Sequence, residues 1–552
     1  MVPPLLLGCQ AHHAVLDMCA APGSKTFQLL EALHAGVGRG GLPTGFVVAN
    51  DADLKRCNLL THQTKRAGSA GLVVTNHDAS LFPDLRDGGP GGAPLKFDRV
   101  LADVPCTGDG TMRKAPEVWA KWGPMNAVGL HPLQLRIALR GARLLAVGGR
   151  MVYSTCSLNP IENEAVVAAL LKEAAGALTL DDCAEELPQL RRLPGLRSWQ
   201  VWDKNGRREG PDGVDAASAP LKPMRPSLFP DAASDALPLQ RCLRVLPHHA
   251  DTGGFFIARF TKHRPLPGEA SPDDKDEASV PAPEEAGAPE AAAGAAAPER
   301  RRNHFAFIDP VVPVTDAKVL ASIAAFYGLD PAFPLLTQTV TRVSESGAAG
   351  ADAGAAPQVP RRLYVVTSGA AALLQSRGAG RLKVMAAGLK VFERGHDEQA
   401  SAGGFSPFRL VHEGLHATLP HARAQRATIA LRELTRLVRD RVLFFAEPTK
   451  PELPGRTTAP ARFEAETAAA LAPLSGGCCI LVPTLSAAQA AGLAVESGED
   501  LAVCAWKGAV SLSLLVAKPD AQHLLRQLLV LNPDMAPAAK TGAEPEAAEA
   551  AE

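Results

Sequence analysis

Two cysteines lie where a reactive thiol could act on a bound ligand. Cys106 is in the segment DVPCTGDGT and Cys156 in YSTCS, and each follows a segment expected to form a strand. A free cysteine is usually a small core residue, but ligands of open α/β sheets bind at the carboxyl ends of the strands. Thiols at two such ends therefore predict nucleophilic chemistry, in which a thiolate adds to an electrophilic carbon.

A run of small residues precedes both thiols and leads from a strand into a helix. It consists of Cys19, Ala20, Ala21, Pro22, Gly23, Ser24 and Lys25. Small side chains let the backbone approach a ligand, and a helix N-terminus offers free N–H groups to an anion such as the carboxylate of a methionine-type methyl donor. The alternative is an ordinary strand–helix turn. The phosphate-binding pattern GxxxxGK[ST] is absent.

Three aspartates follow successive strands of the same unit. Asp51 ends the second expected strand, where the ribose hydroxyls of a nucleoside would lie, and Asp78 ends the third, where an adenine edge would lie. Asp103 ends the fourth, just before Cys106. Each alone is explained by a solvated carboxylate at a strand end. Together, at one edge of a parallel sheet, they favour a nucleoside-type methyl donor.

A methyl donor beside two thiols indicates methylation of a carbon that is not itself nucleophilic. C5 of cytosine is such a carbon, because a thiolate must add at C6 before C5 can accept a methyl group. A hydrogen bond near N3, for which Asp103 is the candidate, would stabilise the adduct. The second thiol would assist loss of the C5 proton and release of the product. The target base must leave its stack to enter such a pocket.

Strand and helix patterns alternate between residues 14 and 262, which predicts a doubly wound, mostly parallel sheet. Strands are expected at 14–20, 45–51, 71–78, 97–105 and 148–157, and helices at 27–34, 54–68, about 130–147 and 159–173. In the last helix, Asn159 is expected to be the N-cap and Glu162 to occupy the third position of a capping pattern. Residues 242–262 are expected to close the sheet as an antiparallel pair.

Composition divides the chain into four parts. Residues 1–262 form the predicted α/β domain, with an excursion rich in Pro, Arg and Asp at 184–240. Residues 263–303 cannot bury enough apolar area to offset their ordering entropy and are expected to be a disordered linker. Residues 304–535 are expected to form an α+β domain, and residues 536–552 a disordered acidic tail.

Bulk composition excludes several classes of protein. The chain has 552 residues, with 57 Lys and Arg against 58 Asp and Glu, so any nucleic-acid-binding surface must be local. The 10 cysteines form no CxxC pair and no Cys/His grouping has zinc-site spacing, so no metal is expected. Neither a secretory signal nor an apolar run of membrane-spanning length is found, which predicts an intracellular chain with reduced thiols.

Four segments resemble, in order, the Nop2/Sun family of S-adenosylmethionine-dependent RNA cytosine-5 methyltransferases: CAAPGSKT, DVPCTGDGTMRK, GGRMVYSTCSLNPIENE and LPHHADTGGFF. The similarity covers residues 1–262. Beyond it, segments such as HFAFIDP, FYGLDPAFPLLTQT and CAWKGAVSL resemble the C-terminal region of a eukaryotic branch that methylates tRNA at several sites. The resemblance implies a Rossmann-like class I methyltransferase fold with a seven-stranded sheet, S-adenosylmethionine as cofactor and tRNA as substrate.

The resemblance also implies roles for individual residues. It makes Cys156, in the TCS motif, the nucleophile, and Cys106, in the PC motif, the group that assists product release. It assigns the segment 19–25, with Asp51, Asp78 and Asp103, to the cofactor site.

Further expectations from the resemblance concern RNA. Arg113 and Lys114 stand where the family has a basic pair and are expected to contact RNA phosphate, with a merely solvated surface as the alternative. The C-terminal domain is expected to be a PUA-like RNA-binding module, or else a structural appendage. Other RNAs are further candidate substrates.

The resemblance also implies a nuclear or nucleolar location, with the cytoplasm as the alternative. The protein is expected to be a monomer.

Three functions remain in competition at this point. The family's domain normally begins well before its first motif, so an N-terminal RNA-contacting region is expected to be missing here. The first prediction is a tRNA cytosine-5 methyltransferase that acts through Cys156. The second is a DNA-type enzyme, in which Cys106 would be the nucleophile. The third is a catalytically impaired RNA-binding or scaffolding protein.

Overall fold

The structure is a computed structural model that describes most of the chain. The described residues are 1–86, 92–202, 208–209, 224–269, 309–343, 359–395, 406–445, 461–493, 495–532 and 535. They form two compact units. The first is drawn from residues 1–313, 340–358 and 364–389, and the second from residues 314–339, 359–363 and 390–552.

The first unit is built on one large sheet, which confirms the predicted doubly wound fold. Its strand order is β17-β3-β2-β1-β6-β7-β13-β12-β9, with β8 also paired to β13. The bounds are β1 Ala14–Asp17, β2 Phe46–Asn50, β3 Leu72–Thr75, β6 Phe97–Asp103, β7 Leu145–Thr155, β8 Leu178–Leu180, β9 Leu193–Pro194, β12 Leu243–Val245, β13 Phe255–Lys262 and β17 Val384–Ala387. The five strands from β3 to β7 are parallel, and β13 is antiparallel to both β7 and β12.

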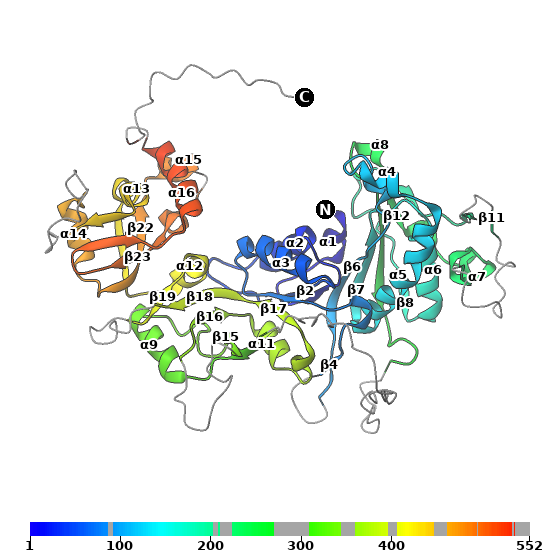
Figure 1. The fold of residues 1–552 in the computed structure, drawn as a ribbon, viewed down its shortest axis with the longest axis horizontal. Helices are drawn as coiled ribbons and strands as arrows, with labels where there is room; N and C mark the ends of the chain where they lie inside the picture. Colours follow the sequence, from blue (N-terminus) through cyan, green and yellow to red (C-terminus); the bar gives the residue numbers. More distant parts are fainter. Residues whose placement is uncertain are drawn as a thin grey trace, which may run out of the picture. The chain divides into compact units, whose positions relative to one another are not determined.

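The central strands are buried on both faces, as expected of a parallel sheet covered by helices. Alternate side chains enter two separate clusters: Val15, Val47, Val74, Leu101 and Val152 in one, and Leu16, Val48, Val73, Val100 and Tyr153 in the other. The first cluster includes residues of α1 (Val2–Leu7), α2 (Ser24–His34) and α3 (Leu54–Thr64), and the second residues of α5 (Pro124–Leu144) and α6 (Glu164–Glu173). Figure 1 shows α2 and α3 on one side of the sheet and α5 and α6 on the other.

Two predicted boundaries differ from the structure. Helix α6 begins at Glu164 with Asn163 as its N-cap, so Asn159 does not cap it. The Glu162 carboxylate instead accepts hydrogen bonds from Thr107 and Ser157, which a local capping pattern does not reveal. The predicted linker starts at residue 263, but Glu269 is ordered, because it forms ion pairs with the buried Lys262 and with Lys96.

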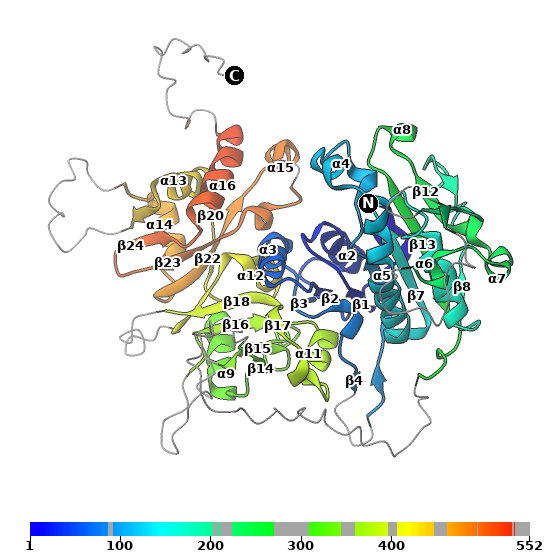
Figure 2. The same ribbon diagram turned by 45° about the vertical axis from the view of Figure 1, so that its right-hand side comes forward.

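Strand β17 comes from the region expected to belong wholly to the C-terminal domain. It pairs antiparallel with β3, and Figure 2 shows the two side by side. The adjoining helix α11 (Ser368–Gln375) is also in the first unit, where the backbone N–H of Gly369 donates to the carbonyl of Thr44. Without β17, the edge of β3 would present unpaired backbone groups. The division at residues 263–303 therefore differs from the structure, because a later segment completes the sheet and makes it larger than the seven strands expected.

Shorter elements complete the first unit. They are β4 (Leu85–Arg86) paired with β5 (Pro94–Leu95), β10 (Val201–Trp202) paired with β11 (Arg208–Glu209), β14 (Val311–Pro313), α4 (Glu117–Lys121), α7 (Ala232–Asp235) and α8 (Pro247–Ala250). Strand β15 (Thr339–Arg342), which pairs with β14, and strand β16 (Arg362–Val365) each have residues in both units. Residues 203–207 and 210–223 of the 184–240 excursion, residues 270–303 of the linker, the loop expected at 347–357 and the tail 536–552 lie outside the described residues.

The second unit is α+β, as predicted for the C-terminal domain. One sheet has the order β20-β22-β23-β24-β21. Its strands are β20 (Arg426–Ala430), β21 (Val442–Phe444), β22 (Gly477–Thr484), β23 (Val503–Lys507) and β24 (Ser511–Leu514). The remaining elements are α9 (Ala317–Tyr327), β18 (Leu389–Arg394) paired with β19 (Phe408–Leu410), α12 (His412–Thr418), α13 (Leu431–Asp440), α14 (Ala465–Leu471), α15 (Ala487–Leu493) and α16 (Lys518–Leu531).

Neither a membrane-spanning helix nor a metal site is present in the described part of the chain. None of its helices combines the length and the apolar character needed to cross a bilayer. No group of three or more His, Cys, Asp or Glu side chains there is arranged to hold a metal ion.

The closure of the sheet by β17 predicts a sensitive glycine. Gly388 follows β17 with φ +69, and a Cβ there would lie 2.5 Å from the carbonyl oxygen of Val365. We expect Gly388→Ala to lower the free energy of unfolding by about 1–3 kcal/mol, because an L-residue is strained in this conformation. Thermal and urea unfolding measure the effect. Gly380→Ala is the matched control, because a Cβ at Gly380 meets nothing within 4 Å, and an equal loss in both variants would contradict the assignment.

Candidate active site

The two predicted thiols lie next to each other. Strands β6 and β7 are parallel neighbours in which Asp103 is opposite Ser154, so the loops that follow them begin side by side. The Sγ atoms of Cys106 and Cys156 are 3.2 Å apart, and both cysteines are free and partly exposed. This separation is that of a hydrogen-bonded thiol pair, in which one sulfur donates and the other accepts.

The surroundings shift the pKa values of the two thiols in opposite directions. A hydrogen bond from the Cys106 thiol lowers the pKa of Cys156, and the charge of Lys25 acts in the same direction, against burial and the charge of Asp103. The pKa of Cys106 is raised by its hydrogen bond to Cys156, by burial and by the charges of Cys156 and Glu162. Cys156 is therefore the member of the pair that loses its proton more readily, and the thiolate is the nucleophilic form of a cysteine.

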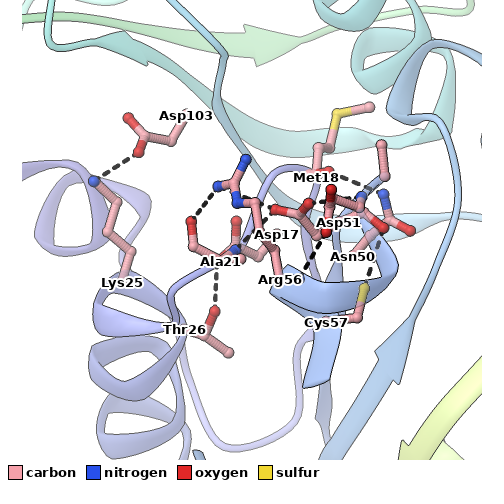
Figure 3. A network of polar contacts seen from close by, with 12 residues as sticks. Asp17, Met18, Ala21, Lys25, Thr26, Asn50, Asp51, Arg56, Cys57 and Asp103 are labelled. Atoms are coloured by element: carbon pink, nitrogen blue, oxygen red, sulfur yellow. Dashed lines mark hydrogen bonds and ion pairs between the residues drawn. The ribbon is translucent and has the colours of Figure 1, made fainter. Parts of the chain in front are cut away.

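Lys25 and Asp103 form an ion pair beside the thiols. The Nζ of Lys25 donates to Oδ2 of Asp103 at 2.7 Å (Figure 3), and the hydroxyl of Ser154 donates to Oδ1 at 2.7 Å. The ammonium also lies 5.1 Å from the ring centroid of Phe255, a cation–π distance. Lys25 was expected to bind the cofactor only. The structure also makes it part of the charge environment of Cys156.

The segment 19–25 is fixed by contacts with the end of β2. Gly23 has φ 112, and a Cβ there would lie 2.9 Å from Cδ1 of Leu60, so glycine is required. The Ala21 N–H donates to Oδ2 of Asp51 at 3.2 Å, and Arg56 donates to the carbonyl of Ala21 at 2.6 Å (Figure 3). Asp51, expected beside a ribose, thus also holds the loop in shape, and its carboxylate is paired with Arg56.

Asp17 is a buried carboxylate that the sequence analysis missed. It ends β1 and is 1% exposed. Its Oδ2 accepts from the hydroxyl of Thr26 at 2.7 Å, whereas Oδ1 has no hydrogen-bond partner among the described residues. Burial raises the pKa of Asp17 to about 7. The rule that singled out Asp51, Asp78 and Asp103, an acidic residue at a strand end, applies equally to Asp17.

Asn50 is a second residue that the sequence analysis missed. Its Nδ2 donates to the carbonyls of Met18 and His77, and its Oδ1 accepts from Thr75 and from the N–H of His77. One buried amide thereby ties together the carboxyl ends of β1, β2 and β3. Its position directly before Asp51 was the available signal.

Asp78 and the basic pair lie apart from this network. Asp78 is exposed and accepts hydrogen bonds from the N–H and hydroxyl of Ser80, as the cap of a short 3-10 turn. Arg113 forms a 2.5 Å ion pair with Asp251, and Lys114 is exposed. Because Arg113 and Asp251 are both mainly exposed, their ion pair contributes little to stability. The contacts of Asp78 with adenine and of the basic pair with RNA stay predictions.

Comparison with known proteins identifies similar chains. Residues 4–198 match the protein family described as "16S rRNA methyltransferase RsmB/F". Residues 310–423 match the family "NSUN2 Pre-PUA domain", and residues 425–530 match the family "NSUN2 PUA domain". The last match confirms the PUA-like character predicted for the C-terminal domain.

Individual relatives are similar over most of the chain. The tRNA (cytosine(34)-C(5))-methyltransferase of Drosophila melanogaster is 36% identical over 548 residues, covering 96% of this chain and 68% of that protein. The multisite-specific tRNA:(cytosine-C(5))-methyltransferase of Saccharomyces cerevisiae is 34% identical, covering 96% of this chain and 71% of that protein. Among solved structures, NSun6 from Pyrococcus horikoshii with SFG is 22% identical, covering 48% of this chain and 51% of that one with a TM-score of 0.32.

The unequal thiols predict selective alkylation. At pH 7 and low conversion, we expect iodoacetamide to modify Cys156 at least about tenfold faster than Cys106, since one pKa unit changes the thiolate fraction about tenfold. Cys9 and Cys57, whose pKa values burial raises to about 12 and about 11, should react later still. Peptide mass spectrometry measures each site. Faster modification of Cys106 would reverse the assignment.

Proposed function

Since the chain belongs to the RsmB/F family of S-adenosylmethionine-dependent RNA cytosine-5 methyltransferases, we propose that it methylates C5 of cytosine in tRNA through a covalent bond between Cys156 and C6 of the base. The observation that carries the proposal is the thiol pair at 3.2 Å, with Cys156 as the member whose pKa is lowered, beside the ion pair of Lys25 with Asp103.

The residues around the loop 19–25 fit the cofactor. The glycine turn brings backbone close to a ligand, the buried Oδ1 of Asp17 needs a donor, and Asp51 is the acidic residue at the end of β2 that nucleoside sites use for ribose hydroxyls. Asp78 is the candidate for the adenine edge. When bound, S-adenosylmethionine supplies an electrophilic methyl group on a sulfonium. The protein must bind it, orient the base and manage the protons.

Cys156 begins the reaction as the nucleophile. Its thiolate forms a bond to C6, and the electron pair of the C5–C6 double bond is released into the ring, which makes C5 nucleophilic. C5 then accepts the methyl group and carries both this group and its original proton. The thiol of Cys106 donates its proton to the departing Cys156 sulfur as the bond from C6 breaks, and the Cys106 thiolate so formed takes the proton from C5 as the double bond is restored. Both cysteines then carry a proton, and Cys156 loses its proton to solvent before the next cycle.

Asp103 and Lys25 support the charge that develops on the base. Addition at C6 raises the basicity of N3, and a proton that the Lys25 ammonium passes to the Asp103 carboxylate can be shared with that nitrogen. The Asp103 carboxylate is held by Lys25 and Ser154 at 2.7 Å each, so its position is fixed before the base arrives. Lys25 also favours the thiolate form of Cys156.

Cys106 assists release of the product. Its sulfur lies 3.2 Å from that of Cys156, close to the atoms that must lose a proton and a leaving group. The DNA-type alternative, with Cys106 as nucleophile, requires a thiolate at the sulfur whose pKa is raised. Retention of both thiols in a hydrogen-bonded pair also favours an enzyme over a catalytically impaired RNA-binding or scaffolding protein.

RNA binding is assigned to two regions. The PUA domain of residues 425–530 would hold the folded body of tRNA, and other RNAs with a similar fold are further candidates. In the first unit, Arg113 and Lys114 precede α4, on which Trp119 is 70% exposed and after which Trp122 is 45% exposed. Exposed tryptophans beside basic residues suit stacking of unpaired bases.

A nuclear location and a monomeric state stay predictions.

Covalent trapping tests the mechanism. With tRNA that contains 5-fluorocytidine, we expect wild type and Cys106→Ala to form adducts that survive denaturing gels, and Cys156→Ala to form none. On ordinary tRNA, Cys106→Ala should turn over about 100-fold more slowly, as expected for loss of one proton-transfer group, and should accumulate the adduct.

Other outcomes of the trapping experiment are equally informative. An adduct that requires Cys106 and survives Cys156→Ala would support the DNA-type mechanism. No adduct in any form, with cofactor binding intact, would contradict the covalent mechanism for this chain and support the RNA-binding alternative.

The proposed RNA surface is tested by substitution of its tryptophans. We expect Trp119→Ala and Trp122→Ala each to weaken tRNA binding about tenfold, within the range of about 1–3 kcal/mol for loss of one stacked base. Lys114→Ala should reduce the slope of log affinity against log salt by about 1. Val147→Ala is the control, because Val147 is 57% exposed and lies at the opposite end of β7 from Cys156. Equal weakening by the control would contradict the assignment.

A further inference from the structure

Glu162 is a wholly buried carboxylate between the two loops that carry the thiols. It lies in the turn between β7 and α6 and has 0% exposure. A buried carboxylate is costly unless several donors satisfy it. Its position therefore reflects the groups that donate to it, and those groups come from both loops.

Four hydrogen bonds reach the Glu162 carboxylate. Oε1 accepts from the backbone N–H of Thr107 at 2.9 Å and from Nε2 of Gln134 at 3.0 Å. Oε2 accepts from the hydroxyl of Thr107 at 2.5 Å and from that of Ser157 at 2.5 Å. Thr107 directly follows Cys106 and Ser157 directly follows Cys156. One side chain therefore ties together the residues adjacent to both thiols.

The surrounding contacts hold Glu162 itself in place. The Tyr153 hydroxyl donates to the backbone carbonyl of Glu162 at 2.6 Å. Gln134, besides binding the carboxylate, donates to the carbonyl of Pro105 at 2.9 Å, just before Cys106. Gln134 of α5 thus holds the carboxylate and Tyr153 of β7 holds the backbone of Glu162, and in this arrangement the sulfurs are 3.2 Å apart.

The charges around the pair are placed asymmetrically. The negative charge of Glu162 is among the causes that raise the pKa of Cys106, after the hydrogen bond to Cys156 and burial. The other charged or titratable groups that act on the pair are Lys25 from α2, Asp103 from β6 and Tyr153 from β7. Of these, Lys25 favours negative charge on Cys156. At Cys156 the charge of Asp103 opposes that of Lys25, whereas at Cys106 the charges of Cys156 and Glu162 both favour the protonated form.

We propose that Glu162 is a positioning residue that fixes the separation of the two thiols and keeps the proton on Cys106, so that Cys156 is the nucleophile. The proposal rests on the proposed function only in that these thiols are the reacting pair. It assigns part of the difference between the two thiols to a side chain that makes no hydrogen bond to the segment 19–25.

Alkylation of the full-length protein without RNA or cofactor tests the role of Glu162. The rates at Cys156 and Cys106 are measured with iodoacetamide at low conversion between pH 6 and pH 10. In Glu162→Gln, we expect Cys106 to react faster and at lower pH than in wild type, and the ratio of Cys156 to Cys106 modification to fall about tenfold, as for a relative change of one pKa unit. An unchanged ratio in folded Glu162→Gln would overturn the proposal.

Glu164→Gln is the matched control. Glu164 is also 0% exposed, two residues away, but it accepts from Arg244 and from the N–H of Leu196 and not from the residues that follow the two thiols. Its link to the Cys156 loop is indirect, through the hydrogen bond of Arg244 to the carbonyl of Leu158. We expect this variant to lose stability, because the charge of Arg244 is left buried, and to keep the wild-type ratio. A fall of the ratio in both variants would mean that general loosening, not Glu162, is responsible, and would overturn the proposal.

A second pair of variants decides the case if Glu162→Gln does not fold. Thr107→Val removes one hydroxyl donor to Glu162, whereas Thr107→Ser keeps it. We expect Thr107→Val to reduce the ratio of Cys156 to Cys106 modification several-fold and Thr107→Ser to retain it, and equal ratios in the two would refute the proposal. Because alkylation needs no tRNA, it gives a result even if covalent trapping fails, so the two proposals can fail separately.

Discussion

The parallel pairing of β6 with β7 is the constraint on which the site depends. The register that sets Asp103 opposite Ser154 brings the two strands to an end together and starts the loops of Cys106 and Cys156 from adjacent points. Both strands are buried on both faces, and a slip by one residue would exchange the side chains that enter the two clusters. The hydrophobic core thus determines a distance between two sulfur atoms that lie outside it.

Electrostatics then distinguishes groups that packing alone leaves equivalent. Lys25 connects the cofactor loop to the reaction centre, because it extends from the start of α2 to Asp103 and acts on Cys156. In the proposed mechanism, binding of the methyl donor and activation of Cys156 therefore share one side chain. On the opposite side, Glu162 supplies the buried negative charge. A fixed ammonium and a fixed carboxylate in a poorly solvated site act strongly on nearby thiols.

The sequence was sufficient to predict the parts of the molecule that local patterns encode. Buried parallel strands give nearly continuous apolar runs, and the thiols and the loop 19–25 stand at the ends of such runs, so the sheet and the reacting pair were predicted. Asp17 is also an acidic residue at the end of a strand, but the sequence analysis did not identify it. Glu162 was assigned to a helix cap, because its spacing from Asn159 fits a capping pattern, whereas its actual donors are 5 and 55 residues away. The pairing of β17 with β3 left no local signal at all.

That pairing has a consequence for synthesis of the protein. Strand β3 ends at Thr75 and β17 begins at Val384, so the ribosome must add roughly 300 residues before the edge of the sheet can be closed. At about 5–20 residues per second, that edge stays open for about 15–60 s on each nascent chain. A product that ends before β17 keeps an unpaired, apolar strand edge that can pair with other chains. The sheet of the first unit is therefore completed only in chains that extend at least to Ala387.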